Sequence, residues 1–560
     1  MAGTTLVWEP PPGVEMLVGA GGPFEIAVED VLGVPCKVFA NRLGNMREVL
    51  VAKTAQHGDL PNLVFPDLTL SFVDVLASAA RIAKWLADRG VRKGDRVAFA
   101  SANVPTYAVG WWATVSSGAI VSSLNGWWTP AELLHGIELS SPRVVLADGP
   151  RLQRLSEVGL PDGVEVHDLA ELDPLLGPPR PDDPPLPDVD IDEDEPAMLL
   201  FTSGTTGRPK AATLSHRNLV HFPTAATLAG AIGAVLAPPA TAPSTPPTQP
   251  SSIMVGPLFH VSGVVPLVTA HTTGSKLVFP PVGAWSETTH LQLTQEHRVG
   301  AWSAVPTQFW RLLEHPDFDT YDTSSVMTIG GGGAVYSPEL LRLMARKMPQ
   351  ARIGVGYGMS ETFGSGARLG GVTMETHPAS VGTVETMCEL EIRGEDGQVV
   401  PDGEVGEINI RGAVVFLGYW DNPEATAKVL DERRWYATGD YGRIVDGVLF
   451  LESRMRDMII RGGENIYPIE IEHRLEEHPD VAEVAVVGVP HHQLGQEVAA
   501  VIVRKPGTTL DEQGARDWVA AELARYKVPT HVVFRDDLPY NATGKVLKHI
   551  LEADIVADLD

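Results

Sequence analysis

The chain has 560 residues, of which 44% are hydrophobic and 20% are charged. A single hydrophobic core usually stops growing at ~250–300 residues, so this length predicts two or more domains. The formal net charge of −28 predicts a soluble protein and disfavours non-specific binding to nucleic acid or anionic lipid. The two cysteines, Cys36 and Cys388, cannot form a disulfide framework or a thiolate metal site, and we expect two buried thiols.

The first residues lack the basic and apolar regions of a secretory signal. No stretch reaches the ~18–20 unbroken apolar residues that a transmembrane helix needs. We therefore expect a cytoplasmic protein without a transmembrane segment.

In chain order, the N-terminal part alternates helices and strands. Ser71 and Asp74 have the spacing of a capping box at the start of a helix that ends at Gly90. Thr129 is a candidate N-cap, and Pro130 a first-turn proline, at the start of a later helix. This alternation predicts an α/β fold with a parallel sheet covered by helices. The other predicted elements are strands at 96–100, 119–121, 143–147 and 197–201 and a helix at 105–118.

Two segments interrupt the alternation. Residues 172–196 are rich in proline and aspartate, which predicts an extended surface connection. Residues 236–250 have a low-complexity sequence of proline, threonine and alanine and are predicted to be a solvated loop.

The last hundred residues have a pattern of their own. A separate small domain is predicted, with its boundary at the charged segment 453–457. Its predicted elements are helices near 468–477 and 511–526 and strands at 481–487, 498–503 and 531–534.

A candidate phosphate-binding loop follows the strand at 197–201. Residues 202–210 read Thr-Ser-Gly-Thr-Thr-Gly-Arg-Pro-Lys. Glycines allow backbone amides to converge on an anion, the hydroxyls donate to phosphate oxygens, and Lys210 adds a positive charge. The spacing is not that of a Walker loop. Taken alone, the segment is also compatible with a polar surface turn.

Four later motifs carry groups that suit a nucleotide. Residues 356–361 (Gly-Tyr-Gly-Met-Ser-Glu) offer an aromatic ring for a base and a carboxylate for a hard cation. Residues 435–440 end in Asp440, which could accept hydrogen bonds from a ribose. Residues 461–465 (Arg-Gly-Gly-Glu-Asn) form a glycine-rich turn, and 541–545 (Asn-Ala-Thr-Gly-Lys) place one lysine on a short loop. Each of these, taken singly, is also compatible with an ordinary loop.

Together and in this order, the motifs resemble those of the adenylate-forming superfamily, which includes acyl-CoA synthetases, carrier-linked adenylation domains and beetle luciferases. The resemblance covers roughly residues 45–550. It implies a large N-terminal region of helix-covered sheets over 1–453, a hinge at 454–457 and a small mobile α+β domain over 458–560.

The resemblance also implies roles for individual residues. Lys545, Glu361 and Thr202 would be catalytic, and Thr202 and Glu361 would contact Mg²⁺. Arg456 would be the hinge residue, and Gly463 would face the pantetheine arm of CoA. The ATP-binding residues would be Thr202, Ser203, Gly204, Thr205, Thr206, Gly207, Lys210, Gly332, Gly333, Ala334, Gly356, Tyr357, Gly358, Met359, Ser360, Asp440, Arg454 and Lys545.

His260, in Pro-Leu-Phe-His, resembles the family's gate between the acyl and pantetheine tunnels, although a core histidine with satisfied ring nitrogens stays an alternative. His473 and His478 are spaced for different faces of a helix and do not form a zinc motif. His491 and His492 are predicted to lie in a surface loop, and the tryptophan pairs 111–112 and 127–128 are predicted to pack in the core.

The predicted function is an AMP-forming acyl-CoA ligase that uses ATP, Mg²⁺ and coenzyme A. Glycines 330–333 remove side-chain bulk and favour a long or bulky apolar acid, with a medium- or long-chain fatty acid first and an aryl or steroid acid second. A carrier-protein phosphopantetheine is the alternative acceptor, and a catalytically silent binding protein is the alternative of another class. A peripheral membrane contact and a homodimer stay open.

Overall fold

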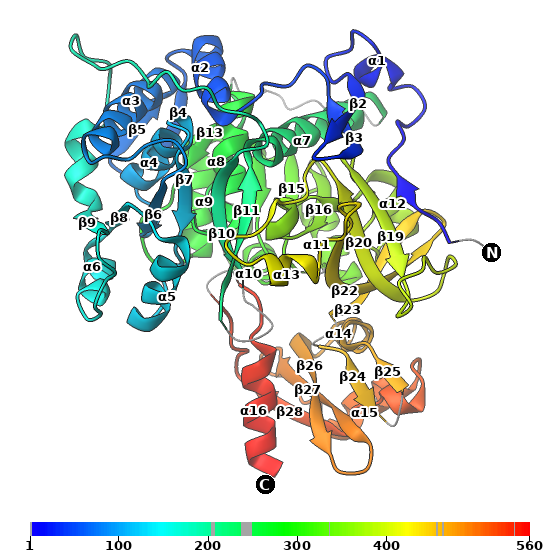
Figure 1. Ribbon diagram of the computed structural model, residues 1–560. Helices are drawn as coiled ribbons and strands as arrows, with labels where there is room; N and C mark the ends of the chain where they lie inside the picture. Colours follow the sequence, from blue (N-terminus) through cyan, green and yellow to red (C-terminus); the bar gives the residue numbers. More distant parts are fainter. Residues whose placement is uncertain are drawn as a thin grey trace.

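The computed structural model describes residues 3–202, 208–236, 249–334, 336–454, 457–461, 464–541 and 544–559. It contains a large N-terminal α/β region and a smaller C-terminal domain, which lies below it in Figure 1. This arrangement confirms the predicted fold class. Within the described residues, the strands form three larger sheets and a hairpin in the N-terminal region and one sheet in the small domain.

The first large sheet has the strand order β21-β11-β10-β7-β6-β8-β9. The strands from β10 to β9 are parallel, whereas β11 and β21 are antiparallel additions at one edge. Its elements are β6 (Arg96–Ala100), β7 (Ile120–Ser123), β8 (Val144–Ala147), β9 (Glu165–Asp168), β10 (Pro196–Thr202), β11 (Lys210–Ser215) and β21 (Gly418–Tyr419), with α3 (Phe72–Asp88), α4 (Pro105–Ser116), α5 (Pro130–Ser140) and α6 (Gly149–Leu155).

The second large sheet has the order β18-β17-β16-β15-β14-β12-β13-β4-β5 and is parallel from β16 to β4. Its elements are β4 (Pro61–Phe65), β5 (Leu68–Ser71), β12 (Ser251–Ile253), β13 (Lys276–Val278), β14 (Ala301–Ser303), β15 (Thr328–Gly332), β16 (Arg352–Gly358), β17 (Gly366–Gly370) and β18 (Thr383–Val384), with α7 (His216–Leu236), α8 (Val261–Thr273), α9 (Glu287–His297), α10 (Pro306–Leu313), α11 (Pro338–Lys347) and α12 (Gly371–Thr376).

An antiparallel sheet and a hairpin complete the N-terminal region. The antiparallel sheet has the order β1-β19-β20-β22-β23. The elements are β1 (Leu6–Val7), β2 (Ile26–Val31), β3 (Val34–Phe39), β19 (Cys388–Arg393), β20 (Gly406–Gly412), β22 (Tyr436–Val445) and β23 (Val448–Arg454), with α1 (Glu15–Val18), α2 (Met46–His57) and α13 (Pro423–Ala427).

The predicted helix starts are confirmed in atomic detail. Ser71 and Asp74 form a complete capping box at the start of α3, and Thr129 and Glu132 form a second one at the start of α5. Each box satisfies backbone N–H groups that a helix leaves without partners in its first turn. These local signals define where each of the two helices begins.

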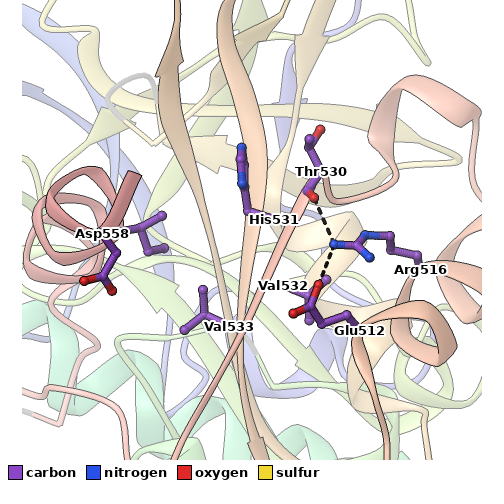
Figure 2. A pocket seen from close by; sticks show the side chains of 8 residues that line it. Glu512, Arg516, Thr530, His531, Val532, Val533 and Asp558 are labelled. Atoms are coloured by element: carbon purple, nitrogen blue, oxygen red, sulfur yellow. Dashed lines mark hydrogen bonds and ion pairs between the residues drawn. The ribbon is translucent and has the colours of Figure 1, made fainter. Parts of the chain in front are cut away.

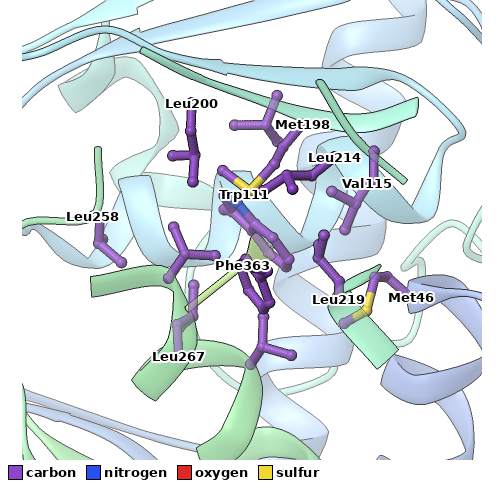
Figure 3. Close-up of a cluster of buried hydrophobic side chains, with 14 of the residues drawn as sticks. Met46, Trp111, Val115, Met198, Leu200, Leu214, Leu219, Leu258, Leu267 and Phe363 are labelled. Atoms are coloured by element: carbon purple, nitrogen blue, oxygen red, sulfur yellow. The ribbon is translucent and has the colours of Figure 1, made fainter. Parts of the chain in front are cut away.

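The main core lies where the two large sheets and their helices meet. Trp111 on α4 is fully buried and packs among aliphatic side chains from β10, α7 and α8, next to Phe363 (Figure 3). Trp112 and Trp128 are also buried, as predicted, but the prediction is wrong for Trp127, which is 60% exposed. Cys36 and Cys388 are buried free thiols, and burial raises the pKa of both.

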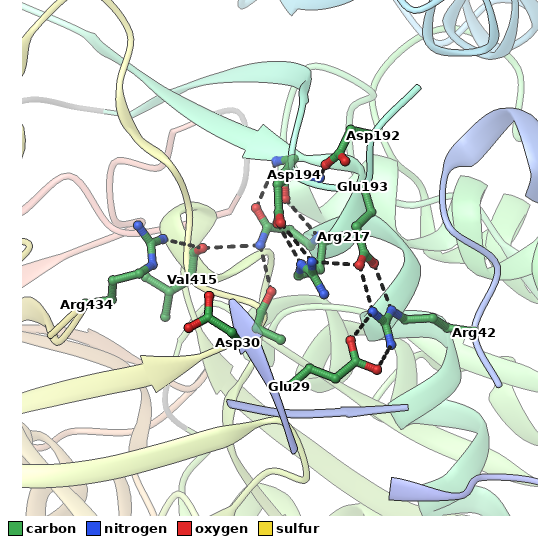
Figure 4. A network of polar contacts seen from close by, with 12 residues as sticks. Glu29, Asp30, Arg42, Asp192, Glu193, Asp194, Arg217, Val415 and Arg434 are labelled. Atoms are coloured by element: carbon green, nitrogen blue, oxygen red, sulfur yellow. Dashed lines mark hydrogen bonds and ion pairs between the residues drawn. The ribbon is translucent and has the colours of Figure 1, made fainter. Parts of the chain in front are cut away.

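A network of charged side chains fastens the end of the proline-rich connection. The Arg42 guanidinium bonds Glu29 of β2 and Glu193, and Arg217 at the start of α7 bonds Asp194 (Figure 4). The Arg42 bond is the main cause of the lowered pKa of Glu29. The connection is therefore irregular, as predicted, but it is held at Glu193 and Asp194.

Helix α7 is long and apolar enough to cross a membrane by length and composition. Its first half is buried and carries the polar side chains of His216, Arg217 and Asn218. Its last residues, including Val235 and Leu236, are about half exposed. The predicted loop at 236–250 falls largely on residues 237–248, outside the described part of the chain.

The small domain contains β24 (Ile459–Arg461), β25 (Glu464–Ile466), β26 (Val481–His491), β27 (Gly495–Arg504) and β28 (His531–Arg535), with α14 (Pro468–Glu476), α15 (Glu512–Ala520) and α16 (Lys548–Leu559). The helix predicted over 511–526 ends at Ala520, because the chain turns there to place β28 parallel to β27. His491 is the last residue of β26, so the predicted surface loop is wrong at that position. His473 lies within α14, whereas His478 follows it and packs on the Trp518 ring.

Candidate active site

The two ends of the candidate phosphate loop are neighbours in the first large sheet. Thr202, at the end of β10, pairs with Lys210 at the start of β11. The ring of His135 on α5 contacts the carbonyl of Pro209 at 3.2 Å. The predicted phosphate ligands Ser203, Gly204, Thr205, Thr206 and Gly207 lie outside the described residues.

Tyr419 connects the phosphate loop with Glu361. The Lys210 ammonium lies 4.9 Å from the centroid of the Tyr419 ring, and the Tyr419 hydroxyl donates to Glu361 Oε1 at 3.0 Å. Burial and the neighbouring Glu361 raise the pKa of Tyr419, which keeps the hydroxyl a donor. Tyr419 was not predicted as a site residue, because a single tyrosine in Gly-Tyr-Trp carries no distinguishing sequence signal.

Glu361 lies on the short 3-10 helix η3 (Ser360–Thr362), directly after β16. Its side chain is buried, and its backbone carbonyl accepts from the Phe416 N–H at 2.8 Å. The carboxylate therefore has a fixed position at the end of β16, a strand of the second large sheet, facing β21 of the first.

Two residues predicted to contact the adenosine are joined by a hydrogen bond. The Tyr357 hydroxyl donates to Asp440 Oδ2 at 2.9 Å, and both side chains are buried. The Thr438 hydroxyl accepts from the Asp440 N–H at 3.1 Å and donates to the Ile408 carbonyl at 2.8 Å. The ring of Tyr357 and the carboxylate of Asp440 thus form one rigid unit. The backbone of Arg454 pairs with Asp440 across β22 and β23, while its side chain is outside the described part.

The glycine run at 330–333 serves the packing of the sheet. A Cβ on Gly330 would lie 1.7 Å from the Gly354 carbonyl oxygen, and one on Gly332 would lie 2.7 Å from that of Gly356. These glycines let neighbouring backbones approach closely. Close packing of the backbones thus explains glycine at positions 330 and 332, and the interpretation that the run leaves room for an acid stays a prediction.

Gly333 differs from the rest of the run. It is exposed, has φ = +86°, and a Cβ there would lie 3.6 Å from Cε of Lys545. Ala334 follows it and is also exposed. The catalytic lysine predicted from the tail is thus next to the predicted glycine strip of the N-terminal region.

Lys545 lies on a turn that packs against the start of α10. The Lys545 N–H donates to Asn541 Oδ1 at 2.9 Å, and a bridge between Tyr540 and Val546 closes the turn. Gly544 has φ = +77°, and a Cβ there would lie 2.7 Å from a methyl carbon of Val305, which precedes α10. This close approach holds the lysine at the site.

His260 is the N-cap of α8, and its Nδ1 accepts from the Ser262 N–H at 3.1 Å. Burial, with a contribution from the Lys545 charge, lowers the pKa of His260 to about 3. The ring is therefore neutral at pH 7, and acceptance at Nδ1 places its proton on Nε2. The side-chain amide of Asn103, which was not predicted, holds this loop through the Gly256 carbonyl and the Leu258 N–H.

Gly356 and Gly358 flank Tyr357 at the end of β16, and Met359 and Ser360 connect the strand to Glu361. A Cβ on Gly358 would lie 2.2 Å from the Gly364 carbonyl oxygen, so this position needs glycine for packing. The predicted hinge residue Arg456 and the predicted pantetheine-facing Gly463 lie outside the described residues.

Two hollows lie away from this cluster. One, in the small domain, is bounded by α15, β28 and α16 (Figure 2). Its Arg516 guanidinium bonds the Thr530 carbonyl and the Glu512 carboxylate. The other lies between the small domain and α10 and α11, where Glu476 faces the N-terminal region. In the first hollow, polar groups of the lining bond one another. The second hollow lies between the two domains.

The family comparison agrees with this geometry. A model described as the AMP-binding enzyme matches residues 50–420, and a model of the AMP-binding enzyme C-terminal domain matches residues 470–545. A feruloyl-CoA synthase from Amycolatopsis sp is 33% identical over 86% of this chain and 92% of that protein. The long-chain-fatty-acid–CoA ligase FadD13 from Mycobacterium tuberculosis is 31% identical over 87% of this chain and 93% of that protein.

Among solved structures, ATP-bound MatB from Rhodopseudomonas palustris has a TM-score of 0.80 and 28% identity, covering 92% of this chain and 100% of that chain. The chain therefore belongs to the AMP-binding enzyme family, among the adenylate-forming acyl-CoA ligases.

Proposed function

We propose that this enzyme activates a hydrophobic carboxylic acid as its acyl-adenylate and transfers the acyl group to CoA. ATP and CoA are the co-substrates that membership of the family implies. A medium- or long-chain fatty acid is the first candidate, which the similarity to a fatty-acid ligase supports. An aryl acid is the second, which the similarity to a feruloyl-CoA synthase supports. The observation that carries the proposal is the position of Lys545 beside Gly333, where an added Cβ would lie 3.6 Å from Cε of the lysine.

The first step forms a bond between a carboxylate oxygen and the α-phosphorus of ATP, and the bond from that phosphorus to the pyrophosphate oxygen breaks. Negative charge faces the incoming carboxylate and grows on the leaving pyrophosphate. In this proposal Lys545, which lies beside Gly333, binds both the carboxylate and an α-phosphate oxygen. Lys210 supplies positive charge at the phosphate-loop end.

The donor set around Glu361 fits a magnesium ion. A buried carboxylate and the Thr202 hydroxyl are hard oxygen ligands, and Mg²⁺ commonly takes one or two carboxylates together with phosphate oxygens and water. When bound, the ion would neutralise charge on the phosphate groups. Tyr419 would orient Glu361 for this role through its 3.0 Å hydrogen bond.

In the second step the CoA thiolate attacks the acyl carbonyl carbon, and AMP leaves with the electrons of the broken mixed-anhydride bond. The neutral His260 ring has its Nε2–H available as a donor beside Lys545. We propose that the small domain turns about Arg456 between the two steps and brings Gly463 to the pantetheine arm.

A pyrophosphate-release screen tests this proposal. Acids from acetate to long fatty acids, aryl acids and steroid acids are each assayed with and without CoA, and acyl-CoA is measured directly. Lys545→Ala should lower acid-dependent pyrophosphate release by ~10²–10³-fold. Lys84→Ala, an exposed lysine paired with Asp88 on α3, is the matched control and should retain the rate.

The outcomes separate the alternatives. If none of the acids gives pyrophosphate release, the proposal fails and a silent homologue is favoured. An unchanged rate in Lys545→Ala would contradict the role proposed for Lys545. Acyl-adenylate formation without acyl-CoA, combined with loading of a carrier protein, would favour the phosphopantetheine acceptor.

A further inference from the structure

Arg368 lies in register with two glycines of the candidate site. It is on β17, directly opposite Gly356 of β16, and Gly356 is in turn opposite Gly332 of β15. Neighbouring strands lie ~4.8 Å apart, so Arg368 is two strand spacings, or ~10 Å, from Gly332. The row thus joins the backbone of Arg368 to the glycine strip next to Lys545.

The Arg368 side chain lies back over β16. A Cβ on Gly354 would be 2.8 Å from Nη2 of Arg368 and 3.5 Å from its Cζ. Gly354 and Gly356 share one face of the strand, because alternate residues point to the same side. The opposite face, with Val355 and Leu369, is buried in a core cluster with Leu340 and Met344 of α11. The guanidinium therefore occupies the face that the glycines leave without side chains.

Helix α7 lies over the far end of the same face. A Cβ on Gly233 of α7 would be 3.9 Å from Nη1 of Arg352, which shares the face with Gly354. Arg368 is half-buried in this position. A group that extends from Lys545 along Gly332 and Gly356 would reach Arg368 at its far end.

Arg368 makes no hydrogen bond and no ion pair with any residue in the described ranges. Burial raises the pKa of Glu385, and the positive charge of Arg368 opposes this by lowering it. Glu385 itself accepts from the Gly366 N–H at 3.3 Å. A guanidinium has five N–H donors in a planar fork and binds carboxylates and other oxyanions with two parallel hydrogen bonds. Its removal from water is favourable only when an acceptor takes those donors.

We propose that Arg368 binds an acceptor oxygen at the distal end of the acid substrate, away from the carboxylate that is activated. This inference rests on the proposed function and narrows its substrate class. The preferred acid has an apolar middle part that passes the glycines and a second carboxylate or a phenolic oxygen at its end. A fatty acid with a plain methyl end leaves the guanidinium without a partner.

A packing role for Arg368 is the competing explanation, because arginine stems often cover apolar or backbone surface. Arg368→Met retains an unbranched stem of similar length and removes the charge and the donors. Arg342→Met, on the exposed face of α11 where Arg342 pairs with Glu339, is the matched control. Thermal unfolding of each variant reports whether the fold is retained.

The experiment compares acids in pairs that differ at the distal end. Octanedioate and decanedioate are measured against octanoate and decanoate, and 4-hydroxycinnamate against cinnamate, by pyrophosphate release. We expect the wild type to favour the member with the distal oxygen at least about tenfold in kcat/KM, the size of one charge-assisted hydrogen bond. Arg368→Met should remove that preference, mainly through KM, and Arg342→Met should retain it.

Calorimetric titration of the same acids reads binding without turnover and separates this inference from the proposed function. If the wild type shows no preference for distal oxygens, or if Arg368→Met weakens both members of each pair equally, the inference fails while the ligase activity stands. If no acid releases pyrophosphate, the proposed function fails. If the diacids still bind and Arg368→Met weakens that binding, the distal site is supported. If the diacids do not bind in an Arg368-dependent way, the distal site is overturned.

Discussion

The N-terminal region and the small domain provide their parts of the site by different means. In the N-terminal region, Thr202, Tyr357 and Glu361 lie at the ends of buried strands or directly after them, and hydrogen bonds join Tyr357 to Asp440 and Glu361 to Tyr419. In the small domain, Lys545 lies on a short turn between β28 and α16. The first part is fixed by two large sheets, whereas the second depends on how the small domain packs against α10. Adenylation should therefore be sensitive to interface changes that leave the N-terminal part intact.

The largest expected effect tests whether the two regions have independent cores. Trp111 lies in the main cluster of the N-terminal region, and the small-domain clusters share no residue with it. Trp111→Ala should destabilise the N-terminal region by ~3–5 kcal/mol, because it removes a large buried ring and leaves a cavity. Calorimetry should show one lowered transition, with the small-domain transition retained. Trp127→Ala, at a 60% exposed position, is the control and should change little. An equal shift of all transitions would contradict independent cores.

The next effect concerns the contact between the Lys545 turn and Val305. Gly544 has φ = +77° and its added Cβ would lie 2.7 Å from Val305, whereas Gly507 has φ = +80° and open space around it. Gly544→Ala should slow adenylation about tenfold or more, since the turn must move away from α10. Gly507→Ala carries the same backbone strain and should cost only ~1 kcal/mol of small-domain stability. Pre-steady-state pyrophosphate release measures adenylation. Equal slowing by both variants would mean that strain, and not the contact, is responsible.

A smaller effect comes from Glu476, which lines the hollow between the small domain and the N-terminal helices. Its Oε2 is buried, and burial raises its pKa to about 7, while Ser337 at the start of α11 lowers it and Glu472 raises it. Glu472 itself pairs with Lys548 at 2.6 Å, and Glu314, Glu339, Arg346 and Lys505 are the other charged groups that line the hollow.

The sign of the pH dependence follows from the raised pKa. The protonated form of Glu476 favours the docked interface, so this contribution is complete below the ordinary value of 4.5 and is lost as the pH rises to about 7. The wild type should lose adenylation rate several-fold between about pH 5 and pH 8 relative to Glu476→Gln, which stays neutral. Parallel pH profiles of the two proteins would exclude Glu476 as the group responsible.

What the sequence could predict follows from how local each signal is. Capping boxes such as Ser71 with Asp74 act within one turn, and the motif loops carry their own glycines and acids, so these features were predictable. Tyr419 has no local signal, because its role comes from the pairing of β21 with β11, which lies far away in the sequence. Arg368 has none, because its role depends on the face of the sheet that its pairing with Gly356 gives it. The helix over 511–526 was predicted too long because its end depends on the pairing of β28 with β27.

The smallest effect tests the rigid unit of the N-terminal part. The Tyr357 hydroxyl donates to Asp440 Oδ2 at 2.9 Å between two buried side chains. Tyr357→Phe retains the ring and removes the donor, which should cost ~0.5–1.5 kcal/mol, or up to about tenfold in the KM for ATP, with kcat nearly unchanged. The ring still bounds the site, while Asp440 loses one of the bonds that orient it. Tyr441→Phe, at the next residue of β22 and only partly buried, is the control. A kcat loss with an unchanged KM would show that the bond acts in the chemical step. The fixed N-terminal part would then contribute to the reaction itself and not only to the binding of ATP.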